Sequence, residues 1–389
     1  MTKSATSSLI EIARSIGQNI AGPAANDVDE KARFPIEALN AIKEQSLLSA
    51  YVPQYLGGAG ASLRDLSMIS EELGRHCGAT AMIFAMHQIQ VACIVHHALD
   101  REYFRNYLSD LVNHQHLIGS VTSELGVGGE MRSSICAVEH DADNFTLVKD
   151  STTSSYGAHA DDLLVTARKS YSSTGNDQVL VLVKKGDFTM AQNGNWNPLG
   201  MRGTCSAPFK LTSKGNIEQI LKVPFSTISS HTMVPVSHFV WAGTWIGTAR
   251  SAVSKARAFV RGQARANPGT VPPTALRLAE VVPLLQLLRT SSDALLSEYE
   301  RLISSDPPSE ELSSLSYALK LNNLKISGSE LIVEIANRAL NICGVAGYKN
   351  DSKFSLGRVL RDAHAAALMV GNDRILHTNA GMLLVLKDD

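Results

Sequence analysis

The chain has 389 residues, of which 44% are hydrophobic and 19% charged, and its formal net charge is −1 at pH 7. This composition is typical of a folded globular protein with a large buried core, and it excludes a disordered chain. The near-neutral charge provides no basic footprint for nucleic acid and no polybasic anchor for a membrane surface. We therefore expect neither nucleic acid nor a membrane among the partners.

The cysteine pattern indicates a reducing compartment. The five cysteines are scattered and form no CxxC pair. Such a set is typical of free thiols rather than a disulfide framework, and it argues against a structural zinc. The N-terminal segment lacks the continuous apolar region of a signal peptide, and no run approaches the ~18 apolar residues that span a bilayer. We expect a cytoplasmic protein without a metal site.

The first third of the sequence predicts helices. Apolar residues recur at three- and four-residue spacing over 7–21, 28–47 and 64–78. Residues 80–97 are apolar almost all round, which predicts a helix in the interior. His87 lies in that segment, and we interpret it as a hydrogen-bonded core histidine in preference to a substrate contact.

The pattern changes twice after this point. From about 117 to 225, short β-branched runs separated by Gly, Asn, Asp and Ser predict antiparallel strands. The remainder is helical again, and the candidate helices are 236–262, 273–303, 309–343 and 357–386.

This order predicts an α+β, mainly α fold in three domains. The expected domains are an N-terminal helical domain at 1–116, a middle β domain at 117–230 and a C-terminal four-helix bundle at 231–389.

Five short strings support one family assignment because they occur in a fixed order. They are Leu56–Gly60, Ser120–Glu130, Leu199–Thr204, Asn341–Tyr348 and Leu360–Ala363. In that order they resemble the "YGG-G" turn, the "TEP-AGSD" signature, the "G-R-S" turn, the "QI-GG-GF" run and the "RDA" string of the acyl-CoA dehydrogenases. The resemblance covers nearly the whole chain. It implies that family's fold, with FAD between the β domain and the bundle and partly in the surface of a neighbouring subunit.

The resemblance also implies contacts to the flavin ring. The glycine-rich end of the Ser120–Glu130 run lets backbone N–H groups approach a ligand, which places Ser123 and Gly128 at the ring. The family's "WIT" string corresponds to Thr153, Ser154 and Ser155. Its tryptophan is replaced, whereas Ser155 keeps the hydroxyl that would reach the N5 edge.

A second set of residues would hold the FAD pyrophosphate. Arg265 corresponds to the arginine of the family's "R--FG" string, which pairs with the pyrophosphate across a subunit interface. The Asn341 run, with Gly344 and Gly347, would approach the same group, although Asn341 is shorter than the usual Gln. These positions imply a homo-oligomer, either a dimer or a tetramer, and Asn372 completes the implied cofactor contacts.

The resemblance fails at the catalytic base. Family members abstract a proton beside a thioester carbonyl with a glutamate nine residues after the arginine of "RDA", and Val370 occupies that place. A minority carry the glutamate on an earlier helix, where this chain has Ser237. Neither residue is able to accept the proton.

Three explanations remain open. Another base is the first, with His238, His364, Asp373 and His87 as candidates; we favour His238 for dehydrogenation and His364 for oxygenation. The second is flavin-dependent monooxygenation. This reaction needs no such base, but it does need a partner flavin reductase. The third is a non-catalytic flavoprotein. The default expectation is α,β-dehydrogenation of an acyl thioester, carried by coenzyme A or a carrier protein, with an electron acceptor flavoprotein as partner.

Overall fold

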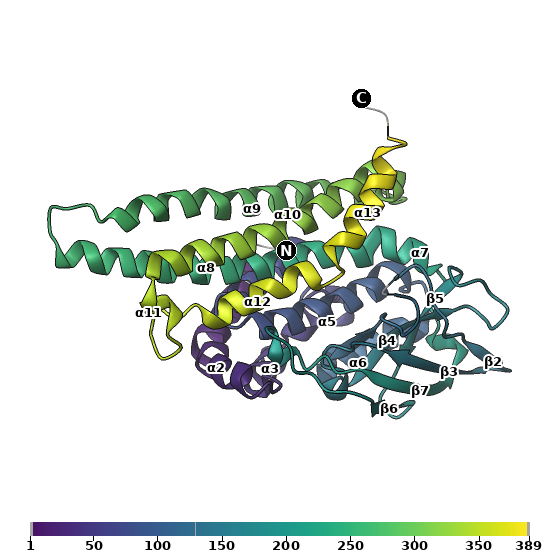
Figure 1. Cartoon of the computed structure of the whole chain (residues 1–389). Helices are drawn as coiled ribbons and strands as arrows, with labels where there is room; N and C mark the ends of the chain where they lie inside the picture. The colour runs from purple at the N-terminus through teal and green to yellow at the C-terminus, as the bar shows by residue number, and fades with distance from the viewer. Residues whose placement is uncertain (1–2, 129, 387–389) are drawn as a thin grey trace.

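The computed structural model describes residues 3–128 and 130–386, and it begins with a layer of helices (Figure 1). These are α1 (Lys3–Ile16), α2 (Gly22–Glu30), α3 (Ile36–Glu44), α4 (Leu63–Gly74), α5 (Gly78–His97) and α6 (Glu102–His114). The single helix expected over 28–47 is wrong, because the chain leaves the helical conformation between Glu30 and Ile36. Pro35 explains the break, since a proline disfavours helical backbone at the residue before it.

The expectation of an interior helix at 80–97 is confirmed by α5. This helix has the length and hydropathy of a membrane span, but 89% of its most apolar window is buried inside the molecule. It packs against α4, α8 and β1 and so lies in the main hydrophobic core. Its apolar surface is therefore covered by protein on all sides.

The middle segment forms two small sheets. The strands are β1 (Ile118–Val121), β2 (Glu139–Asp141), β3 (Asn144–Ser151), β4 (Asp162–Arg168), β5 (Gln178–Val183), β6 (Phe188–Gln192) and β7 (Phe209–Asn216). One sheet has the order β1-β4-β5 and the other β2-β3-β7-β6. The expectation of antiparallel strands fails for one pair, because β1 and β4 are parallel. The β2–β3 hairpin, which lies between them in sequence, joins the other sheet, so β4 can return beside β1 in the same direction.

The C-terminal segment is helical. Its elements are α7 (Phe225–Ile228), α8 (Val234–Ala266), α9 (Pro273–Ile303), α10 (Leu315–Cys343), α11 (Val345–Tyr348), α12 (Gly357–Leu368) and α13 (Asn372–Leu383). Helices α8, α9, α10 and α12 pack into the expected bundle, and α4 of the first layer packs along α8.

One long helix over 357–386 was expected, and this is wrong. The helix stops after Leu368 and restarts at Asn372. Between them Val370 has φ of +51°, in the left-handed region, which costs a β-branched residue on the order of 1–2 kcal/mol. After the break α13 leaves the direction of α12 and runs across the end of α10 (Figure 1).

Two of the sequence strings join the domains. The buried Asp362 carboxylate accepts a hydrogen bond from the backbone N–H of Met201 (2.7 Å), and Arg361 pairs with Asp29 of α2. Burial raises the pKa of Asp362 to about 6. The "RDA" string and the Leu199–Thr204 turn are therefore structural contacts.

The change from helix to strand lies between α6 and β1, and residues 229–233 already form a helical turn continuous with α8. The domain limits at 116 and 230 stay predictions.

Candidate functional site

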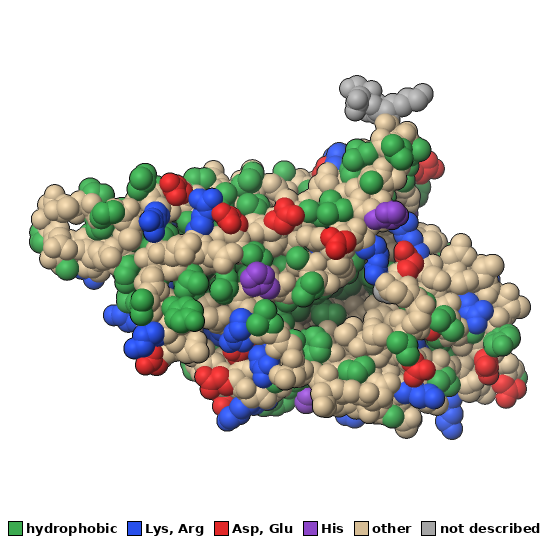
Figure 2. All heavy atoms as spheres, viewed as in Figure 1, with side chains coloured by type: hydrophobic (Ala, Val, Ile, Leu, Met, Phe, Trp, Pro, Cys, Tyr) green, Lys and Arg blue, Asp and Glu red, His purple; other side chains and the backbone are tan. Residues whose placement is uncertain are grey.

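Contacts join three separate segments beside the hollow that we call the cleft: the turn after β1, the loop after β3 and the start of α13. Figure 2 shows a hollow with a hydrophobic floor between the C-terminal helices and the β domain. The guanidinium of Arg374 on α13 donates to the carbonyl oxygen of Gly128, which ties the bundle to the turn after β1. Gly129, within the same turn, lies outside the described residues.

Ser123 and Thr153 are brought together as the sequence predicted. The Ser123 hydroxyl donates to the carbonyl oxygen of Thr153 (2.7 Å) and accepts from its backbone N–H (3.1 Å). Gly128 has φ of +58°, and a Cβ built on it would meet nothing within 4 Å. The turn is thus fixed on its inner side by Ser123 and open on the side of Gly128.

Ser155 ends a chain of hydroxyl groups that begins in the interior. Buried Thr204 lies 2.8 Å from buried Ser206 (Oγ1 to Oγ), and Ser206 donates to the half-buried Ser155 (2.9 Å). Because Ser155 accepts this bond, its own hydrogen is left to donate to a ligand. Ser206 and Thr204 were not singled out in the sequence, where nothing distinguishes them from other serines and threonines in turns.

The acid of the "TEP-AGSD" string is structural. Buried Glu124 accepts from the Ser134 hydroxyl (2.6 Å) and the Cys136 backbone N–H (2.5 Å), and the Lys149 ammonium lies 3.4 Å away. Burial lowers the pKa of Lys149, and the charge of Glu124 opposes that shift. Because its oxygens are occupied inside the β domain, Glu124 serves to hold the turn that carries Ser123.

Neither residue at the two family base positions carries an acid. Val370 lies in the turn between α12 and α13, and the buried Ser237 donates to the carbonyl oxygen of Met233 (2.5 Å). The nearby Asp373 is exposed in the first turn of α13.

The three candidate histidines differ in environment. His238 is buried; its Nδ1 bonds to the carbonyl oxygen of Val234 (2.7 Å), and its Nε2 has no hydrogen-bond partner among the described residues. Burial lowers the pKa of His238 to about 4, and the charge of Lys325 adds to the shift. His364 is exposed on α12. His87 is a core residue with both ring nitrogens bonded, to the Leu48 carbonyl (2.8 Å) and the Ile118 N–H (3.0 Å).

Asn372 lies in a buried polar group that the sequence did not reveal. Its amide oxygen accepts from the ammonium of Lys325 (2.6 Å), and its amide nitrogen donates to Ser329 (3.0 Å). Lys325 is fully buried on α10. A signal was present, because Lys325 falls among the apolar residues that recur at helical spacing toward the core, such as Leu321 and Leu324.

The predicted pyrophosphate contacts lie away from this cleft. Arg265 ends α8, and Asn341 and Gly344 end α10, at the same end of the bundle and opposite α13 (Figure 1). All three are exposed, whereas Gly347 is buried. Gly344 has φ of +56° with open space around it. Within one chain these residues do not meet Ser123, so their cofactor role stays a prediction that requires a second subunit.

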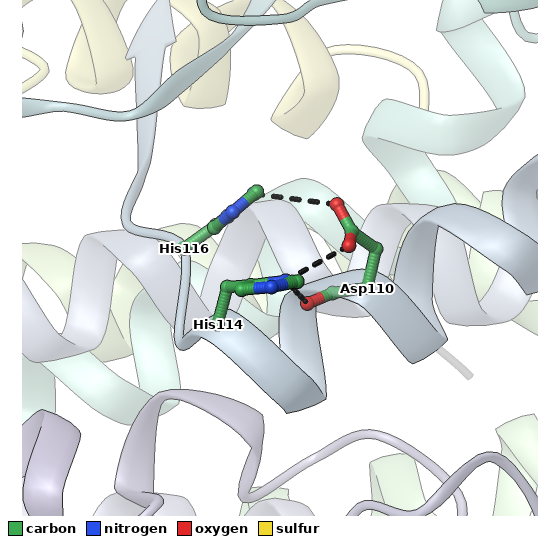
Figure 3. A group of neighbouring side chains, drawn as sticks. All are labelled: Asp110, His114 and His116. Atoms are coloured by element: carbon green, nitrogen blue, oxygen red, sulfur yellow. Dashed lines mark hydrogen bonds and ion pairs between the residues drawn. The ribbon is translucent and has the colours of Figure 1, made fainter.

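A cluster of Asp110, His114 and His116 lies outside the cleft (Figure 3). Their candidate ligand atoms lie within 4.8 Å of one another, a spacing that a metal ion could bridge. Protein partners already occupy them: His114 bonds to the Asp110 carboxylate (2.9 Å), and His116 bonds to the buried Asp162 (3.0 Å). The hydrogen bond from Asp162 raises the pKa of His116. We interpret the cluster as ion pairing at the end of α6.

The comparisons with known proteins agree with this architecture. Residues 5–115 match the acyl-CoA dehydrogenase N-terminal domain, and residues 232–383 match the acyl-CoA dehydrogenase C-terminal domain. The chain belongs to the acyl-CoA dehydrogenase family, whose members are flavin-dependent oxidoreductases.

The chain is distantly similar to several known proteins along nearly its whole length. Cyclohex-1-ene-1-carbonyl-CoA dehydrogenase of Geobacter metallireducens is 21% identical over 97% of each chain. Butyryl-CoA dehydrogenase from Megasphaera elsdenii has a similar structure, with a TM-score of 0.83 at 17% identity over 99% of each chain. The dibenzothiophene monooxygenase of a Paenibacillus species gives a TM-score of 0.81 at 18% identity over 97% of each chain. The same fold therefore carries both dehydrogenases and a monooxygenase.

Proposed function

We propose that this protein is an FAD-dependent oxidoreductase that works without a carboxylate base, and that oxygenation by reduced flavin and O2 is its reaction. The observation that carries this proposal is the pair Val370 and Ser237 at the two family base positions. Removal of a proton beside a carbonyl needs a positioned base, and its loss commonly costs on the order of 10²–10⁴ in rate. Insertion of one oxygen atom into an amine, a sulfur or an aromatic carbon has no such requirement.

The residues of the cleft fit a flavin. Gly128 offers backbone that no side chain shields, and Ser155 has a hydroxyl hydrogen free to donate toward the edge of the ring. Ser123 fixes the turn through its two hydrogen bonds to the backbone of Thr153. When bound, the flavin supplies the electrons that oxygen requires. This chain would bind the ring with Gly128, Thr153 and Ser155, while Ser123 and Asn372, whose polar groups already bond to protein, would shape the site. Arg265, Asn341, Gly344 and Gly347 of a neighbouring copy would bind the pyrophosphate.

A second candidate is α,β-dehydrogenation of an acyl thioester, on coenzyme A or a carrier protein. His238 favours it, because its buried Nε2 has a lone pair without a partner in the part of the chain that the structure describes, and its low pKa keeps the ring neutral near pH 7. The full-length likeness to a CoA dehydrogenase points the same way. In this reaction His238 would take the α-proton, and the flavin, when bound, would supply the acceptor for the β-hydride.

The partners differ between the two candidates. Oxygenation draws electrons from a flavin reductase, whereas dehydrogenation delivers them to an acceptor flavoprotein. In both cases the protein would work in the cytoplasm as a homodimer or homotetramer.

An anaerobic titration separates the candidates. The FAD-loaded protein would be mixed with short- and medium-chain acyl-CoA thioesters, and the flavin absorbance followed. We expect no bleaching of the wild type, whereas chemically reduced protein mixed with ¹⁸O₂ and an amine, sulfide or phenol panel should give a product that carries one ¹⁸O atom. Stoichiometric bleaching of the wild type by any thioester would establish dehydrogenation instead.

The variant Val370→Glu is the matched control for the pocket. Bleaching by thioesters in Val370→Glu alone would show that the pocket admits them and that the wild type lacks only the base. If the wild-type protein takes up no FAD, both candidate reactions are refuted, because each of them requires bound FAD.

A further inference from the structure

Lys325 is a buried cation beside the position where the family has its base. Its side chain is fully buried on α10, and burial of an ammonium group is unfavourable unless acceptors replace water. The two acceptors are the carbonyl oxygen of Val370 (3.1 Å) and the amide oxygen of Asn372 (2.6 Å). Both belong to the α12–α13 turn, and neither carries a charge.

Ser329 extends this contact by one helical turn. It follows Lys325 by four residues, so the two side chains lie on the same face of α10. The Asn372 amide nitrogen donates to the Ser329 hydroxyl (3.0 Å), which in turn donates to the carbonyl oxygen of Ile326 (2.8 Å). The amide of Asn372 is thereby oriented at both ends, with oxygen toward Lys325 and nitrogen toward Ser329.

These contacts restrain a turn in which a β-branched residue adopts an unfavourable backbone conformation. The alanine-rich segment before Leu368 favours continued helix, yet Val370 adopts positive φ and directs its carbonyl to Lys325. The bond to Lys325 fixes that carbonyl, and the bonds of Asn372 fix the first residue of α13.

We propose that Lys325, together with Asn372 and Ser329, is a positioning residue that fixes the α12–α13 turn. By fixing the turn, it sets the orientation of residue 370 relative to the flavin cleft. The inference rests on the proposed function only in placing the flavin in that cleft. Lys325 acts through the turn and touches no reacting atom.

The test compares Lys325→Met with Lys320→Met. Lys320 is on the same helix but pairs with Glu298 at the surface, so it is a matched control. Hydrogen exchange of residues 369–374 would be measured with and without FAD, with 330–340 of α10 as the internal reference. We expect exchange at 369–374 to rise by about tenfold or more in Lys325→Met, with the reference and the Lys320→Met protein unchanged.

The second readout is the visible circular dichroism of bound FAD, which reports the asymmetric surroundings of the ring. We expect an altered spectrum at unchanged FAD stoichiometry in Lys325→Met, and partial recovery in Lys325→Arg. Wild-type exchange at the turn, or an equal rise throughout α10 and α13, overturns the proposal.

Two further variants decide the question if Lys325→Met does not fold. Asn372→Ala and Ser329→Ala each remove hydrogen bonds of the Asn372 amide, while Lys325 keeps its hydrogen bond to the carbonyl oxygen of Val370. We expect faster exchange confined to 369–374, and wild-type exchange in both would overturn the proposal. Absence of FAD from the wild type would contradict the proposed function, whereas the exchange data would still decide the role of Lys325.

Discussion

At the scale of single residues, the histidines of this protein divide by burial. Burial lowers the pKa of the two buried histidines, His87 and His238, to about 4. For His87 the tautomer follows from its partners, because the Ile118 N–H must donate to Nδ1, which leaves Nε2–H to donate to Leu48. These histidines are neutral in the folded protein near pH 7.

The neutral histidines predict loss of stability in acid. Their folded pKa of about 4 lies below the unfolded value of 6.5, so the unfolded chain binds more protons between those limits. The stabilisation is complete above pH 6.5 and is lost as the pH falls toward 4. From pH 7 to 5.5, each such group should cost on the order of 1 kcal/mol of unfolding free energy.

Urea unfolding of the wild type, His87→Gln and the exposed-site control His114→Gln at both pH values would check this. The stability difference between wild type and His87→Gln should shrink in acid by about that amount. A constant difference would show that His87 does not titrate as its burial implies.

At the scale of elements, close backbone approach joins the β domain to α12. A Cβ on Gly200 would overlap the backbone of Arg361 and Asp362, where the "RDA" string passes the Leu199–Thr204 turn. The ion pair of Arg361 with Asp29 and the bond of Asp362 to Met201 lie on either side of this contact. The position of α12, and with it the break at Val370, depends on a glycine at residue 200.

Gly200→Ala should therefore destabilise the protein, by about 1–3 kcal/mol, because neither backbone can move without loss of these contacts. Gly262→Ala is the matched control. Gly262 lies exposed within α8 with nothing near its Cβ position, so alanine there should stabilise the helix by about 0.5–1 kcal/mol. Thermal unfolding of both variants measures the two effects, and equal shifts would contradict the predicted backbone overlap.

At the scale of the whole molecule, the two parts of the predicted FAD site lie at opposite ends of the bundle. The predicted ring contacts include Gly128, which is bonded to Arg374 of α13, whereas Arg265 and Asn341 are exposed at the far end of the bundle (Figure 1). A single chain does not bring them together. A homo-oligomer in which one copy supplies the pyrophosphate contacts to the next would account for both locations.

Arg265→Ala should therefore raise the dissociation constant of FAD by roughly tenfold to a hundredfold, the equivalent of about 1.5–3 kcal/mol for hydrogen bonds to a charged group. Arg261→Ala, an exposed arginine one turn earlier on α8, is the control and should bind FAD normally. Flavin titration with light scattering gives affinity and assembly together. If the protein is a monomer and binds FAD equally well with and without the Arg265 side chain, the predicted role of Arg265 at a subunit interface is wrong.

The sequence by itself determined the fold class, the helices with long apolar periodicity and the ordered strings of the family. α9 begins and ends where expected, at Pro273 and Ile303, and α5 is buried as predicted. These features are local, because periodicity and end signals lie within the segment that folds. The absence of a carboxylate at Val370 and Ser237, the base positions that the family resemblance implies, could also be read from the sequence.

Only the tertiary structure decided the features that depend on distant partners. The parallel pairing of β1 with β4 needs a strand more than 40 residues away. The break at Val370 is held by Lys325 of another helix, and the environments of His87, His238 and His364 follow from what packs around each ring. A side chain's burial and bonding are set by residues remote in sequence, and no local pattern records them.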